Sequence, residues 1–114
     1  GGMRPFGISF IVGGIDRTGK RLFETEPSGA LAEYHAIAIG RNRNKAMDLF
    51  EKDWKENLSR DAAVRLCVKG IESGLEEKEK LEVKRLEFIY IDSAKQFKPI
   101  SQDEIKSILN NKKE

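Results

Sequence analysis

The chain has 114 residues, which is enough for one domain at most. Hydrophobic residues make up 39% of it and charged residues 35%, a balance typical of a globular chain with an ionic surface and not of a disordered one. The net charge of +2 is too small to attract nucleic acid or a membrane surface by field alone, and no apolar run approaches the ~18 residues of a membrane span.

The first part of the chain carries strand patterns. Residues 7–16 (GISFIVGGID) predict a strand with apolar side chains on both faces. The turn-forming residues 16–20 separate it from a second predicted strand over 21–26. A turn at 26–29 then leads to a third strand over 31–39. Strands joined by such short turns indicate an antiparallel meander.

The middle of the chain changes to a helical period. Over residues 44–57, Ala46, Phe50 and Trp54 recur every four positions and predict an amphipathic helix that Asn57 ends.

A second helix is predicted directly after it. Ser59 is its expected N-cap, and Asp61 lies in its first turn, where a negative charge is favoured. The lone cysteine falls in the apolar stripe of this helix and is expected to be a buried, inert thiol. The stripe consists of Val64, Cys67, Val68, Ile71 and Leu75.

The last part of the chain predicts two more strands and a helix. A charged segment at 76–82 reads as a solvated helix end or loop, and strands are expected over 86–92 and 96–100. Ser101 and Glu104 have the spacing of a capping box for a final helix, and Ile100 with Ile105 has that of a hydrophobic staple.

The predicted order groups strands with strands and helices with helices, which favours an α+β fold. Strands that are apolar on both faces need cover on both sides. The helices are expected to cover one face of the sheet, and a second sheet from elsewhere would cover the other.

No catalytic or metal-binding set stands out in the sequence. His35 is the one histidine, and no cysteine or acidic cluster lies at ligand spacing from it, so it is read as a packing or surface residue. No phosphate loop or serine nucleophile elbow occurs. Glu24 and Glu26 flank Thr25 and have the chemistry to bind a cation, but surface placement on a half-exposed strand is the expected role.

A small basic cluster precedes the first helix. Arg41, Arg43 and Lys45 stand at a helix start, where phosphate or a carboxylate is readily bound. Three readings stay open: a solvated helix start, a contact with another subunit or a peptide carboxylate, and nucleic-acid binding. The last would need more basic residues on one face and aromatic side chains for stacking.

Three sequence blocks resemble the proteasome α-type subunits, particularly the archaeal kind. They are Arg4-Pro5-Phe6-Gly7, then Leu22-Phe23-Glu24-Thr25-Glu26-Pro27-Ser28-Gly29, then Ala38-Ile39-Gly40. The segment 49–54 (LFEKDW) is similar to a following helix of that family, and the segments 88–92, 96–98 and 101–105 fit its closing strands and helix. The resemblance extends from Gly1 to about Leu109.

The resemblance implies a fold of its own. The family has a four-layer αββα sandwich of the N-terminal nucleophile hydrolase class, and these blocks come from its middle. Residues 1–114 are therefore expected to be the C-terminal half of a single α-type domain, with a three-strand meander, two helices, two strands and one helix. The complementary N-terminal half lies outside this chain, and we expect the chain to be obligately bound to it.

The resemblance also implies a function. Subunits of the α type form the heptameric outer ring of the proteasome core particle, which gates the entry of proteins for degradation. They contact other α-type and β-type subunits and dock a regulatory ATPase. The chain is therefore expected to be a non-catalytic, cytoplasmic structural subunit, without cofactor or metal and without nucleic acid or membrane as a partner.

The sequence argues against the catalytic β type. The β-type nucleophile is an N-terminal threonine, whereas residue 1 here is Gly and the only threonines are Thr18 and Thr25. Where the β type has a serine–glycine pair after the glycine equivalent to Gly40, this chain has Arg41 and Asn42. Two alternatives remain: a peptidase subunit whose nucleophile lies in the missing half, and a small basic α+β module that binds nucleic acid.

Overall fold

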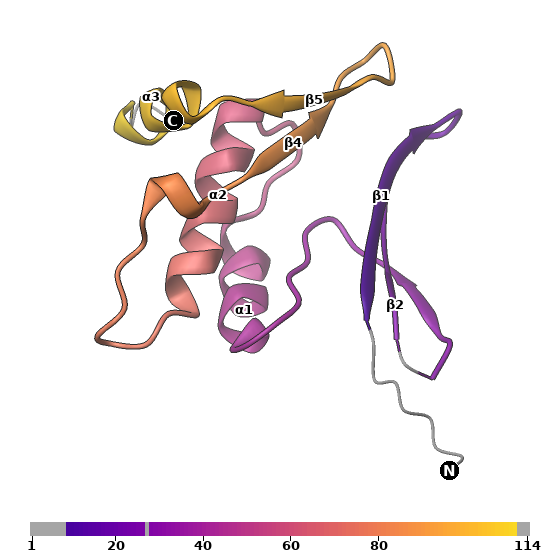
Figure 1. Ribbon diagram of the computed structural model, residues 1–114. Helices are drawn as coiled ribbons and strands as arrows, with labels where there is room; N and C mark the ends of the chain where they lie inside the picture. The colour runs from indigo at the N-terminus through magenta and orange to yellow at the C-terminus, as the bar shows by residue number, and fades with distance from the viewer. Residues whose placement is uncertain (1–8, 27, 112–114) are drawn as a thin grey trace.

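The computed structural model describes residues 9–26 and 28–111 and confirms the α+β class. Its elements follow the predicted order, with one added turn of 3-10 helix, η1, before the fourth strand (Figure 1). The elements are β1 (Phe10–Asp16), β2 (Gly19–Thr25), β3 (Leu31–Glu33), α1 (Arg43–Asp53), α2 (Arg60–Ser73), η1 (Val83–Arg85), β4 (Phe88–Ile91), β5 (Phe97–Ile100) and α3 (Gln102–Asn110).

The first three strands form an antiparallel sheet in the order β1-β2-β3, which confirms the predicted meander. The tight turn between β1 and β2 follows from its residues. Gly19 has a φ of 118°, in the left-handed region that glycine favours. The Asp16 carboxylate accepts hydrogen bonds from the backbone N–H of Thr18 at 2.8 Å and from its hydroxyl at 2.6 Å. From this turn, β1 and β2 pair in a register that runs from Asp16 opposite Gly19 to Phe10 opposite Thr25.

The third strand is shorter than the predicted range 31–39, because the chain leaves the sheet after Glu33. The last bond to the meander runs from the Tyr34 N–H to the Leu22 carbonyl at 2.9 Å. Beyond it, Ala36 and Ala38 pack against buried residues of α1 and α2. Contacts with the helices, which no strand pattern reveals, therefore decide where β3 ends.

Two other parts of the predicted meander extend beyond the described residues. The predicted strand 7–16 is observed from Phe10, and residues 7 and 8 are outside the described ranges. At the predicted turn 26–29, the Gly29 N–H donates to the Glu26 carbonyl at 2.8 Å, while Pro27 is itself not described.

The boundary between the first two helices is partly as predicted. Helix α1 ends at Asp53 and not at Asn57, because Trp54 takes an extended backbone. Asn57 does mark the break, with a φ of 63°. Ser59 is the N-cap of α2 as predicted, and its side chain accepts the Ala62 N–H at 3.1 Å.

The predicted capping box of the last helix is half confirmed. The Ser101 hydroxyl accepts the Glu104 N–H at 3.1 Å, as an N-cap should. The Glu104 side chain, however, pairs with Arg60 of α2 at 2.6 Å and does not reach back to Ser101. The predicted N-cap of α3 is therefore confirmed. The predicted return bond of the Glu104 carboxylate to Ser101 is wrong, because this carboxylate links α3 to α2 instead.

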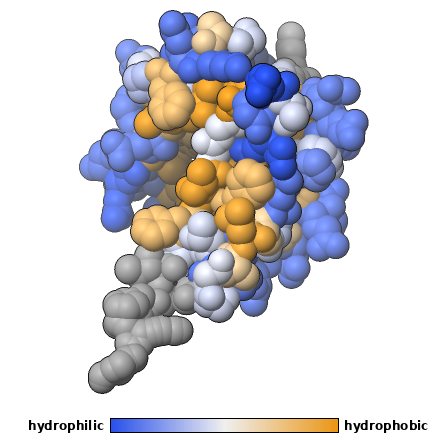
Figure 2. Space-filling model, turned by 90° about the vertical axis from the view of Figure 1, so that its right-hand side faces the viewer, coloured by the Kyte–Doolittle hydropathy of each residue, from blue (hydrophilic) through white to orange (hydrophobic). Residues whose placement is uncertain are grey.

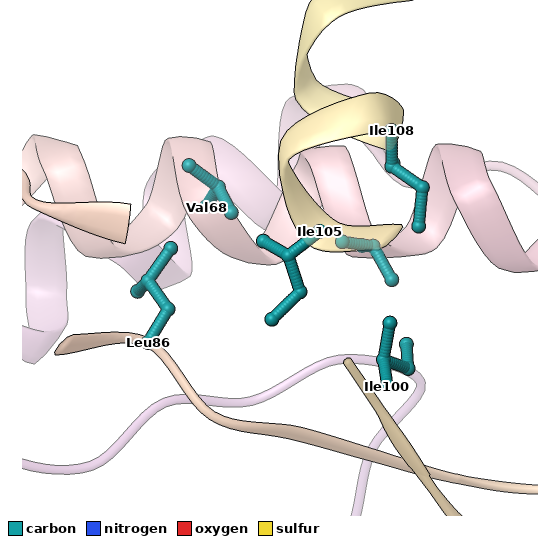
Figure 3. Close-up of a cluster of buried hydrophobic side chains, with 6 residues drawn as sticks. Val68, Leu86, Ile100, Ile105 and Ile108 are labelled. Carbon is teal, nitrogen blue, oxygen red and sulfur yellow. The ribbon is translucent and has the colours of Figure 1, made fainter. Parts of the chain in front are cut away.

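The interior is divided between two clusters of buried side chains, both in the helical part of the molecule. One cluster lies between α2, α3 and the β4–β5 hairpin, where the Ile105 side chain is fully buried (Figure 3). The other lies between α1 and α2 and contains Ala46, Phe50 and Leu66. Among the described residues, no side chain of β1, β2 or β3 belongs to either cluster.

The molecule is consequently open in shape. Its radius of gyration is 15.5 Å, compared with the about 13 Å expected for a compact domain of this length. The meander lies to one side of α1 and α2 (Figure 1). The β4–β5 sheet and α3 lie near the N-terminal end of α2. The two sheets do not share a strand pairing, so each has edges and faces of its own.

Candidate functional site

The described residues lack one kind of site, a cluster of metal ligands. No group of three or more His, Cys, Asp or Glu side chains in residues 9–26 and 28–111 is placed to hold a metal ion. His35 is exposed and stacks on Trp54, with ring centroids 4.3 Å apart and an interplanar angle of 14°. This confirms its predicted role as a packing or surface residue. Within the described ranges 9–26 and 28–111, no helix has the length and apolar character needed to cross a bilayer.

Both threonines serve the local structure of the meander. The Thr18 hydroxyl donates to Asp16 at 2.6 Å in the β1–β2 turn. The Thr25 hydroxyl accepts the Phe10 N–H at 3.2 Å across the same two strands.

Cys67 is a correction to the sequence analysis, because its side chain is exposed and not buried. It lies on the side of α2 that faces the meander, and it lines a groove there together with Ile11 and Ile71. Partial desolvation by this surrounding raises the pKa of the Cys67 thiol, which keeps the thiol protonated and poorly nucleophilic at neutral pH. The predicted inertness is thus compatible with the site, although the predicted burial was wrong.

The apolar stripe predicted for α2 is also divided differently. The buried residues of α2 are Val64, Leu66, Val68 and Gly70, which face α1 or α3. Ile71, a predicted stripe residue, is 45% exposed. Helix α2 therefore has apolar groups on more sides than its neighbours cover.

Glu24 is the second correction. The sequence analysis placed it on the surface, but it is only 3% exposed. Its carboxylate accepts two hydrogen bonds from Arg43, at 2.6 Å and 3.2 Å. The bond with Glu24 raises the pKa of the Arg43 guanidinium above its ordinary value. Glu26, by contrast, is exposed as predicted.

The three residues of the basic cluster have different surroundings. Arg41 donates to both oxygens of Glu79, at 2.8 Å and 3.1 Å, across to the loop after α2. Arg43 points to Glu24, and Lys45 is exposed on the first turn of α1. The structure does not gather these side chains around one point. Their predicted contact with a partner stays a prediction.

The outer face of the meander is an apolar surface. Cross-strand pairing puts Phe10 and Val12 on the face opposite to Glu24, and both are more than half exposed, at 59% and 52%. Leu31 of β3 lies on the same face and is 62% exposed. Figure 2 views the molecule from the side of the meander and shows hydrophobic side chains gathered in the middle, with hydrophilic ones around them. We call Phe10, Val12 and Leu31 the outer apolar patch.

The inner face of the meander borders the groove that contains Cys67. This groove has a volume of about 410 Å³ and lies between β1, the segment after β3 and α2. Its apolar walls include Ile11, Ile37, Ile39, Ile71 and Leu75. A second, larger hollow of about 1020 Å³ lies beside α2 and the segment that joins α1 to it, and is lined mainly by charged and polar side chains. We call the first of these the interlayer groove.

The sequence contains a signal for the two faces of the meander. Alternation along β1 correctly separates Phe10 and Val12 from Ile11. The alternation of β2 puts Glu24 on the same face as Ile11, where a carboxylate needs a partner. Only the fold shows that Arg43 is that partner, because 19 positions separate the two residues.

Comparison with known proteins gives the same family as the sequence blocks. The model of the family "Proteasome subunit" matches residues 1–91. A protein of Methanocaldococcus jannaschii is 41% identical over 109 residues, which are 96% of this chain and 41% of that protein. A protein of Methanothermobacter thermautotrophicus is 41% identical over 107 residues, 93% of this chain and 42% of its own length.

A third relative, from Methanosarcina acetivorans, is 50% identical over 66 residues, covering 58% of this chain and 27% of the relative. All three relatives are named "Proteasome subunit alpha". The chain spans about two fifths of the length of the first two, which it matches along nearly all its residues. With its meander, helices and closing hairpin in the expected order, the chain belongs to the proteasome subunit family.

Proposed function

We propose that this chain is the C-terminal half of an α-type domain and a non-catalytic, structural part of the outer ring of a proteasome core particle. The observation that carries the proposal is the match to proteins named "Proteasome subunit alpha" over 96% of this chain but 41% of the relative. In this role the chain supports gated entry of proteins for degradation and has no chemical step of its own.

The first proposed partner is the complementary N-terminal half of the domain. Two features of the described residues support it. Strand β1 pairs with β2 on one side only, so the other edge of the sheet offers unpaired backbone groups. The outer apolar patch and the interlayer groove expose apolar surface on both faces of the same sheet. Such surfaces are typical of interaction sites.

Further partners follow from the proposed place in a ring. They are neighbouring α-type subunits, the β-type subunits and a regulatory ATPase, and the proposed location is the cytoplasm. Arg41, Arg43 and Lys45 are candidate contacts with a neighbouring subunit. Arg41 has a side chain 61% exposed despite its pair with Glu79, and Lys45 is exposed as well.

Native mass spectrometry tests the proposal. The chain is measured alone and after co-expression with the N-terminal segment of the Methanocaldococcus jannaschii relative that precedes the matched region. We expect a one-to-one complex that grows into a closed ring. A matched variant, Val12→Lys, puts a charge on the outer apolar patch and is expected to weaken the complex. A chain that stays monomeric and soluble in the presence of that segment would refute the proposed pairing.

A further inference from the structure

The meander is attached to the helices by a short segment of chain, residues 34–42. The backbone bond from Tyr34 to Leu22 is the end of the meander. From the next residue on, the segment belongs to the helical part: His35 stacks on Trp54, and the Ala38 N–H donates to the Met47 sulfur at 3.3 Å. The chain bends at residues 35 and 36. This bend is therefore a single covalent joint between two bodies.

A second attachment lies beside this joint, because Glu24 is only two residues along β2 from Leu22, the backbone partner of Tyr34. Glu24 is near the end of β2, on the inner face of the meander, and Arg43 is the first residue of α1. Their two hydrogen bonds of 2.6 Å and 3.2 Å form a bidentate ion pair. The Glu24 side chain is 3% exposed and that of Arg43 is 33% exposed, so the pair is largely shielded from solvent. Shielding makes an ion pair less sensitive to screening by salt.

The Arg43 end of this pair is held firmly to the helical part. The residue before it, Asn42, adopts a φ of 60° and donates from its side-chain amide to the Gly74 carbonyl at 2.7 Å. Arg41 pairs with Glu79 beyond the end of α2. The start of α1 is thus fixed to the end of α2 on one side, and Arg43 reaches the meander on the other.

Little else in the described residues fixes the angle between the two bodies. The strands of the meander contribute no side chain to either buried cluster. The space between the meander and α2 is the interlayer groove and not a packed interface. Two bodies joined by one segment of chain are able to swing about it, whereas a side-chain contact beside that segment restricts the swing.

We infer that the Glu24–Arg43 ion pair is a latch across a hinge at residues 34–36, and that it sets the spacing between the meander and the helices. The latch keeps the interlayer groove at its observed width. Arg suits this role because its rigid fork of donors matches both carboxylate oxygens and so fixes orientation as well as distance. The inference concerns this chain alone and does not depend on the proposed function.

Pulsed electron spin resonance between two spin labels tests the latch. One label is attached through Arg17→Cys in the β1–β2 turn and the other through Glu72→Cys on α2; both positions are exposed. Cys67→Ser is present throughout, because the native thiol is itself exposed. The distance distribution is then measured in this background and with Arg43→Met added.

Arg21→Met is the matched control. Arg21 also forms two hydrogen bonds with a carboxylate, that of Glu33, at 2.6 Å and 2.9 Å. This pair joins β2 to β3 and lies entirely within the meander, so its loss removes an ion pair without opening the hinge.

With Arg43→Met we expect a broader distribution and a longer mean distance, while Arg21→Met leaves both unchanged. Circular dichroism checks that each variant remains folded, and if Arg43→Met does not fold, Arg43→Lys decides the question, since it keeps the charge but loses the fork. An unchanged distribution in a folded Arg43 variant overturns the inference. Equal broadening by Arg21→Met overturns it too, because the effect would then be a general loosening of the meander.

Discussion

At the scale of single residues, Gly70 shows how closely α1 and α2 approach. It is a buried residue in the last turn of α2, and glycine is ordinarily unfavourable within a helix. A Cβ at this position would lie 2.6 Å from Cζ and 2.7 Å from Cε1 of the Phe50 ring. The missing side chain is therefore the space that the Phe50 ring occupies, and the contact between the two helices depends on it.

We predict that Gly70→Ala lowers the free energy of unfolding. Alanine gains about 1 kcal/mol of helix propensity, but the forced shift of a packed ring costs more, for a net loss of about 1–2 kcal/mol. Denaturant unfolding followed by the fluorescence of Trp54, the only tryptophan, measures the change.

Gly14→Ala is the control for this prediction, because a Cβ at Gly14 meets nothing within 4 Å. It should leave the stability nearly unchanged. Adding Phe50→Leu to Gly70→Ala should relieve part of the clash. Equal stabilities of the Gly70→Ala and Gly14→Ala variants would contradict the role of Gly70 as a contact point.

At the scale of elements, the β4–β5 hairpin depends on one carboxylate. Asp92 accepts the backbone N–H of Ala94 and that of Gln96, each at 2.9 Å, and it pairs with Lys98 at 3.0 Å. The bond from the Gln96 N–H is the main cause that lowers the pKa of Asp92, and Lys98 adds to it. The charged form of Asp92 is therefore part of the turn, which brings Ile100 of β5 to the cluster with α3.

The sign of the pH dependence follows from this lowered pKa. The stabilisation by Asp92 is fully present above the pKa of an aspartate in the unfolded chain, about 3.9, and is lost as the pH falls through the lower pKa of the folded state. We predict that Asp92→Asn is less stable than the unaltered chain at neutral pH and that this difference shrinks below about pH 4. Unfolding curves measured from neutral to acid pH test this.

Asp48→Asn serves as the comparison, since Asp48 is an exposed aspartate on α1 outside the hairpin. If both variants lose stability with the same pH dependence, the effect is one of overall charge and the proposed role of the turn is wrong.

At the scale of the whole molecule, the layers are incomplete. The helical clusters bury Ile105 and its neighbours, but the meander exposes apolar side chains on its outer face and borders a groove on its inner face. The radius of gyration of 15.5 Å is larger than that of a compact domain of this length, which agrees with these uncovered faces. A sheet with an apolar face normally has a packed layer against it. The outer apolar patch is the face where such a layer is missing.

We predict that Phe10→Ser combined with Val12→Ser reduces self-association of the isolated chain and its binding of the dye ANS. The two side chains are 59% and 52% exposed and belong to neither buried cluster, so little stability should be lost with them. Light scattering and dye fluorescence measure the effect, and a thermal melt checks the fold. Lys80→Ser combined with Lys84→Ser, two exposed positions elsewhere, is the control. Similar changes in the control pair would show that the outer apolar patch is not responsible.

The sequence by itself determined the order of the strands and α-helices and the family. Local signals are short in range and act within a few residues, so they were right where local chemistry decides: Ser59 and Ser101 cap their helices, and Gly19 shapes the first turn. The family blocks were specific for a similar reason, because each is a run of adjacent residues, and the family match over residues 1–91 confirms them.

Only the tertiary structure decided what lies between elements. Three observations depend on which element packs opposite, and no local pattern predicts that. They are the end of β3 at Glu33, the exposure of Cys67 and the pairing of the Glu104 carboxylate with Arg60. The clearest case is Glu24, a charged residue that a strand pattern assigns to the surface. Burial of a charge is tolerated only with a partner, and its partner, Arg43, comes close only when the chain folds back between β2 and α1.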